Sequence, residues 1–185
     1  MANVNSPFGF ADGRPMNGAC DGEIESFTIA TGLSANIGYD DFVKMTGTGR
    51  NITVAAAGDT TIIGRFKGVR YIDANGAPVS RKNWPTGTTG TNIEALVDTN
   101  TNQELICQAD SCAEGDVGAT CDIVVGTPNA FGHSTSYAEG SSTATSGKTL
   151  LILGLAPLPE NAYGKYAKIR VKRVEGLLLG TAAGV

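Results

Sequence analysis

The sequence predicts an all-β protein, built from one or two small barrel-like or sandwich-like modules with an extended N-terminal arm and long loops. Twenty-five of the 185 residues are glycine and only 17% are charged, which is typical of a turn-rich β protein rather than a helical one. Short runs of β-branched and aromatic residues alternate with Gly, Asp and Asn turns, and no long segment keeps a helical period of 3.6 residues. A chain of this length can bury a core without disulfides.

Residues 1–22 are predicted to form an extended arm. The segment is polar and rich in Gly and Asn, and its prolines disfavour a helix. Its apolar side chains Phe8, Phe10 and Met16 are too few to form a core. Two interpretations fit this composition equally well: a frayed terminus, or an arm that docks onto a neighbouring protein.

Residues 23–97 are predicted to form a first β module around a hairpin. Residues 62–72 are rich in residues that suit strands, and Asn75-Gly76 favours the positive φ of a tight turn. Trp84, the only tryptophan, is expected to be a packing anchor. The other strands of this module are expected at residues 25–29, 42–45, 52–55, 78–82 and 95–97.

Residues 98–175 are predicted to form a second, interleaved β module, followed by a tail at 176–185. Its strands are expected at residues 105–108, 121–125, 150–155 and 167–174, with an exposed polar loop at 126–148. In the last strand Lys168 and Arg170 alternate with apolar residues. This pattern fits a solvated strand face or a surface complementary to an acidic partner.

The net charge of −4 and the pI of about 4.9 argue against a direct nucleic-acid partner, since phosphate contacts need a basic surface. The N-terminus lacks a basic segment followed by an apolar run, and no stretch approaches the roughly 20 apolar residues that cross a bilayer. The sequence therefore predicts neither a membrane partner nor a secretory route, and favours synthesis in a reducing cytoplasm.

The cysteines Cys20, Cys107, Cys112 and Cys121 are expected to be free thiols in that reducing compartment. Their spacing lacks the paired Cys-x-x-Cys pattern of a structural zinc site. Buried thiols are the favoured interpretation, and a disulfide formed late, after release from that compartment, is the alternative.

Three other features of the sequence partly resemble known binding or catalytic motifs. Residues 146–149, Ser-Gly-Lys-Thr, lack the first glycine of a phosphate loop and precede a predicted strand rather than a helix. Residues 98–102 begin like a calcium loop, but Gln103 stands where that loop needs glycine. A pair between His133 and a cysteine remains open as a catalytic alternative. We therefore predict no catalytic, cofactor-binding or metal site, and no enzyme.

Three segments carry a resemblance to a known family: residues 1–19, MANVNSPFGFADGRPMNGA; residues 62–88, IIGRFKGVRYIDANGAPVSRKNWPTGT; and residues 149–174, TLLILGLAPLPENAYGKYAKIRVKRV. Together they resemble the capsid decoration proteins, also called cement or head-stabilising proteins, of tailed bacteriophages. The four cysteines and the tail from Gly176 depart from that pattern.

The resemblance implies a structural protein that binds the outside of an assembled phage head, bridges major capsid protein subunits and resides in the virion. Because copies lie on a symmetric lattice, self-association is expected, as a trimer by preference or as a dimer. The residues expected to contact the capsid are Phe8, Phe10, Arg14, Met16, Tyr71, Trp84, Lys168 and Arg170.

Two other function classes are alternatives. A phage fibre or carbohydrate-binding module for host attachment would need sugar-stacking aromatic residues, which make up only 6% of the chain and include Tyr137 in the long loop. A small hydrolase would need a catalytic constellation, and His133 is the only histidine from which to build one.

Overall fold

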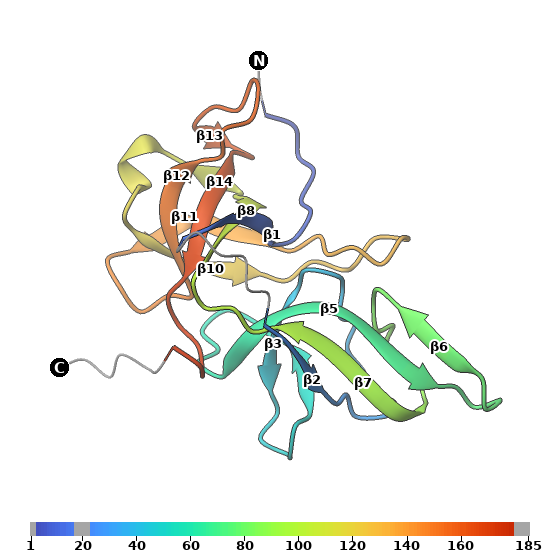
Figure 1. The fold of residues 1–185 in the computed structure, drawn as a ribbon. Coiled ribbons are helices and arrows are strands. Elements are labelled where there is room, and N and C mark those ends of the chain that lie inside the picture. The colour runs from blue at the N-terminus through green and yellow to red at the C-terminus, as the bar shows by residue number, and fades with distance from the viewer. Residues whose placement is uncertain (1–2, 17–22, 180–185) are drawn as a thin grey trace.

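The computed structural model describes residues 3–16 and 23–179. These residues form β-strands, their connections and a short 3-10 helix at Glu114–Asp116 (Figure 1). In this part of the chain no helix has the length and apolar character needed to cross a membrane. The prediction of an all-β fold is confirmed.

Sheet I is built from the first half of the chain. Its strands are β2 (Ile24–Phe27), β3 (Phe42–Met45), β4 (Ile52–Val54), β5 (Ile62–Ile72), β6 (Pro78–Arg81) and β7 (Thr91–Asp98). The order across the sheet is β2-β7-β5-β3-β4, and β6 pairs with the end of β5 at residues 69–72. All pairings are antiparallel, and β5, with 11 residues, is long enough to pair with three neighbours.

Sheet II combines the second half of the chain with a strand from its beginning. Its strands are β1 (Ala11–Pro15), β8 (Gln103–Gln108), β10 (Thr120–Val124), β11 (Tyr137–Ala144), β12 (Leu150–Leu155) and β14 (Lys168–Arg173). The order is β1-β8-β14-β12-β10-β11, and β9 (Ser111–Cys112) pairs with β13 (Gly164–Lys165) in a separate ribbon. Among the described strands neither large sheet closes on itself, so the modules are sandwich-like rather than closed barrels.

The hairpin between β5 and β6 forms the turn that the sequence predicts. Gly76 has φ +81°, and its N–H donates to the carbonyl of Asp73. The Asp73 carboxylate also accepts hydrogen bonds from the N–H groups of Asn75 and Ala77, at 2.9 Å each. An aspartate that binds the backbone of its own turn fixes the reversal and therefore the register of the hairpin.

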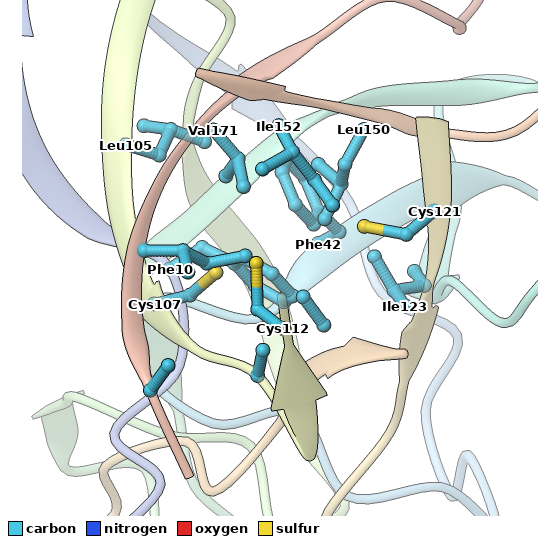
Figure 2. Close-up of a cluster of buried hydrophobic side chains, with 14 of the residues drawn as sticks. Phe10, Phe42, Leu105, Cys107, Cys112, Cys121, Ile123, Leu150, Ile152 and Val171 are labelled. Carbon is cyan, nitrogen blue, oxygen red and sulfur yellow. The ribbon is translucent and has the colours of Figure 1, made fainter. Parts of the chain in front are cut away.

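Each sheet has its own apolar core. The core of sheet I is formed by Phe27, Ile29, Ile37, Val43, Ile52, Ile63, Phe66, Val69, Tyr71, Trp84, Ala95 and Val97. The core of sheet II gathers side chains from β8, β10, β12 and β14, among them Leu105, Ile123, Leu150, Ile152 and Val171 (Figure 2). Phe42 and Ile62 of sheet I also belong to this second core, so the two modules share buried surface.

The predicted loop at residues 126–148 is only partly a loop. Residues 137–144 form β11, which pairs with β10 and takes up about a third of the expected loop. The sequence of β11, YAEGSSTA, is polar because the second half of the strand is exposed at the edge of sheet II. The strand is held by backbone pairing, which the apolar pattern does not predict.

Candidate interaction surface

The joint between the two sheets is a cluster of charged side chains around Arg65. Arg65 lies on β5 and its side chain is 4% exposed. The guanidinium donates to the carbonyl oxygen of Phe10 at 2.8 Å, to Asp12 Oδ1 at 2.5 Å and to Gln103 Oε1 at 2.8 Å. It also forms a close ion pair with Asp98 of β7. A single side chain of sheet I thus bonds to β1 and β8 of sheet II.

Lys67 extends this joint. Its ammonium lies 3.0 Å from Asp12 Oδ2 and 2.6 Å from Asp40 Oδ1. Burial and the charge of Arg65 lower the pKa of Lys67, but the two carboxylates outweigh both and raise it above 10.5. Burial raises the pKa of Asp12, yet Arg65 and Lys67 outweigh this effect and lower it to about 2. Both groups are therefore charged at neutral pH.

A second polar contact connects the sheets at Asp41. Its carboxylate accepts hydrogen bonds from the hydroxyl groups of Ser134 and Ser136, at 2.5 and 2.6 Å, and from the N–H of Gly38 at 2.7 Å. Burial raises the pKa of this carboxyl group, and the three donors oppose the rise. The contact ties residues 134–136, which lead into β11, to the loop before β3.

The turn at residues 129–132 precedes this anchored segment and presents Phe131, whose side chain is 83% exposed. Asn129 Oδ1 accepts hydrogen bonds from the N–H groups of Phe131 and His133, at 2.9 and 3.1 Å. Sequence analysis did not select Phe131. The sequence does contain a signal for this residue. Asn129 and Gly132 are typical turn residues, and an aromatic residue between them is expected to lie at an exposed turn.

The N-terminal segment is not the free arm that the sequence predicts. Residues 11–15 form β1 at the edge of sheet II, and Phe10 is fully buried against Phe42, with ring centroids 4.5 Å apart. Phe8 is half-buried, whereas Arg14 and Met16 are exposed. The chain's own core therefore covers the ring of Phe10, and none of it is exposed for the predicted capsid contact. Residues 1–2 and 17–22, which complete the predicted arm, lie outside the described residues.

The two hairpin candidates are also core residues. Trp84 is fully buried and Tyr71 nearly so, and their rings meet edge to face with centroids 5.4 Å apart. The prediction of Trp84 as a packing anchor is confirmed. Their rings pack against each other in the core of sheet I, so little of either side chain is exposed for the predicted capsid contact.

Lys168 and Arg170, the two predicted contact residues on β14, bond to other residues of the same chain. Lys168 donates to the carbonyl oxygen of Val4 at 2.6 Å, and Arg170 contacts Glu104 at 3.3 Å. Both are half-buried, and they alternate with the buried Ile169 and Val171 as predicted. Arg14 and Met16 are thus the two sequence-predicted contact residues that are fully available at the surface.

The two segments that partly resemble a phosphate loop and a calcium loop form ordinary turns. Lys148 is paired with Asp122 at 2.9 Å, and a strand follows it as predicted. In residues 98–102 the Asp98 side chain accepts a hydrogen bond from the N–H of Asn100 and also pairs with Arg65. In the described part of the chain no group of three or more His, Cys, Asp or Glu side chains is arranged to hold a metal ion.

Three of the four cysteines lie in the core of sheet II. Cys107, Cys112 and Cys121 are buried and free, as predicted, while Cys20 lies outside the described residues. Burial raises the pKa of Cys112 to about 11 and that of Cys121 to about 12, and it raises the pKa of Cys107 well above its usual value. Such thiols are poor nucleophiles at neutral pH, which disfavours a catalytic pair with His133.

Comparison with protein-family models, with curated proteins and with solved structures finds no match for this chain. Functional interpretation therefore rests on the residues and on the geometry of the joint and of the exposed turn.

Proposed function

We propose that this chain is a non-enzymatic capsid decoration protein, which binds the outer surface of an assembled phage head, bridges neighbouring major capsid subunits and stabilises the shell. The proposal starts from the resemblance carried by residues 1–19, 62–88 and 149–174. The second of these segments forms β5, β6 and the loop that carries Trp84, and the turn between β5 and β6 lies at one end of the molecule (Figure 1).

The observation that carries the proposal is the charged joint around Arg65. A protein that bridges two subunits must hold its contact surfaces in one geometry, because a flexible bridge would lose binding free energy on ordering. Arg65 connects the sheets through Asp12 and Gln103, and Asp41 adds a second connection through Ser134 and Ser136. A body held in this way supports a mechanical role.

A protein of this kind stabilises a shell by binding the assembled form better than the loosened form. The gain in heat resistance should therefore follow the fraction of sites that are filled. Mixing undecorated heads with increasing amounts of the protein, and melting each mixture, tests this relation. Heads that bind the protein without gaining heat resistance would contradict the stabilising role.

Copies of a decoration protein lie around the local symmetry axes of the head. We therefore expect self-association, with a trimer preferred and a dimer second. Sedimentation equilibrium of the free protein and the number of copies per head would test this part of the proposal. A monomer in solution that also binds heads as separate single copies would refute it.

A carbohydrate-binding module is the second candidate function, and one groove favours it. The groove has a volume of about 550 Å³ and is lined by Tyr137 and Tyr166 together with the polar side chains of Gln108 and Asp110. Tyr166 has φ +60°, and a strained backbone at a bulky residue is often kept for function. A glycan array probed with the protein and with Tyr137→Ala tests this candidate, and no signal from the unaltered protein would remove it.

A further inference from the structure

The turn at residues 129–132 holds its exposed aromatic residue in a fixed position. The N–H of Asn129 donates to the carbonyl of His133, and the N–H of Gly132 donates to the carbonyl of Asn129, both at 2.9 Å. Gly132 has φ +80°, and a Cβ at this position would lie 2.7 Å from Asn83 Oδ1. The turn therefore packs closely against the residue pair that follows β6, and its conformation needs glycine.

Phe131 is the most exposed large apolar side chain among the described residues. Isolated exposed apolar residues are common, but this one is an aromatic ring on a turn whose backbone is already ordered. Burying such a ring against a partner costs little conformational entropy, because only the side chain remains to be fixed. These are the properties of an anchor residue in a protein interface.

The surroundings of Phe131 are basic. Arg81 and Lys82 precede Asn83, both are exposed, and neither forms an ion pair with any described residue. The Lys82 ammonium lies 5.8 Å from the centre of the Tyr39 ring, and the N–H of Tyr39 donates to the carbonyl of Gly132 in the turn at 2.9 Å.

Acidic residues are absent from both segments that meet here. Residues 78–90 and 126–137 contain no Asp or Glu, although the whole chain has a net charge of −4. The Asp41 carboxylate that contacts Ser134 and Ser136 is buried, whereas Arg81 and Lys82 are exposed. Exposed positive charges of this kind are complementary to a carboxylate-rich partner.

We propose that Phe131 inserts into an apolar pocket with an acidic rim on a capsid subunit, with Arg81 and Lys82 facing the carboxylates of that rim. This contact rests on the proposed function and names the part of the protein that meets the head. Phe131 sets how slowly the complex dissociates, and the two basic residues set how fast it forms.

The test measures binding of the full-length protein to purified, undecorated heads by co-sedimentation. Phe131→Ser should weaken binding by about tenfold or more, the usual effect of truncating an interface anchor. Phe131→Leu, which keeps apolar bulk, should recover part of the affinity. Val117→Ser is the matched control, because Val117 is also an exposed apolar residue, 43% exposed, at the end of the 3-10 turn between β9 and β10. It should bind as the unaltered protein does.

The charged residues are tested by association rates at several salt concentrations. Lys82→Glu should slow association and reduce its dependence on salt, whereas the same reversal at the exposed Lys165, on β13, should change neither. The melting temperatures of all variants should match that of the unaltered protein, because these side chains lie at the surface.

The outcomes separate the two proposals. If the unaltered protein fails to bind heads, the proposed function and this contact fall together. If it binds and Phe131→Ser binds equally well, the contact is wrong while the proposed function stands. If Phe131→Ser leaves head binding intact but breaks an oligomer on size exclusion, the pocket belongs to a second copy of this chain and the capsid contact is overturned.

Discussion

Arg65 on β5 donates a hydrogen bond to Asp12 on β1, with 2.5 Å between Nη2 and Oδ1. The two residues lie 53 positions apart in the chain and belong to different sheets, so this bond connects sheet I to sheet II. The same guanidinium pairs with Asp98 beside it in sheet I. Because Arg65 and Asp98 are both buried, removing the arginine would leave the Asp98 charge without its partner in the interior.

Replacing Arg65 with methionine should lower the free energy of unfolding by about 3–5 kcal/mol, the usual cost of leaving one partner of a buried ion pair uncompensated. Arg50→Met is the matched control, since Arg50 forms an ion pair with Glu25 in which both side chains are about half exposed. Its loss should cost less than about 1 kcal/mol. Urea unfolding of both variants measures the difference, and equal losses would mean that the joint adds nothing beyond a surface pair.

Asp12 should make stability depend on pH in acid. Its pKa is lowered from 3.8 to about 2 in the folded protein, so its contribution is complete above pH 4 and is lost as the pH falls from about 4 to about 2. The difference in unfolding free energy between the unaltered protein and Asp12→Asn should therefore be constant above pH 4 and shrink towards pH 2. A difference that stays constant throughout this range would show that the carboxylate gains nothing from Arg65 and Lys67.

Gly64 should tolerate no side chain. It lies on β5 opposite β7, and a Cβ there would lie 2.1 Å from the carbonyl oxygen of Asp98. Gly64→Ala should therefore displace β7 from β5 and lower the melting temperature strongly, or prevent folding. Gly115→Ala is the control, because no atom lies within 4 Å of its added Cβ and its φ is not in the left-handed region. If both variants have the same melting temperature, β5 and β7 must lie farther apart at Gly64 than the structure shows.

The buried cysteines should resist thiol reagents. Cys107, Cys112 and Cys121 are buried with raised pKa values, so an aromatic disulfide reagent at pH 8 should leave them unmodified in the folded protein and modify them in guanidinium. Peptide mapping by mass spectrometry identifies the modified positions. Rapid modification of Cys107 in the folded state would contradict its place in the core of sheet II.

The sequence predicts those strands whose apolar pattern and flanking turns agree. Residues 42–45, 62–72 and 150–155 form strands with the predicted bounds, because each is a short, mainly apolar run. The strands β1 and β11 were missed. Their sequences, ADGRP and YAEGSSTA, lack this pattern, and they form because an edge of sheet II offers unpaired backbone groups.

Contact residues were harder to predict than strands. Phe10 and Trp84 are predicted contacts because their side chains are apolar, but an apolar residue suits a core as well as an interface. The sequence does not say whether the chain's own core or a partner covers such a residue. Phe10 is buried by side chains distant in sequence, such as Phe42 and Leu105. Phe131 is exposed only because its turn is held away from both cores, which depends on the tertiary fold.

The central claim is that this protein binds and stabilises an assembled head. The most direct test adds the purified protein to expanded, undecorated heads, counts the bound copies by co-sedimentation and then melts the heads. We predict saturation at a fixed number of copies per head and a melting temperature that rises in proportion to occupancy. Protein that remains in the supernatant at every concentration, with the melting of the heads unchanged, would contradict the account.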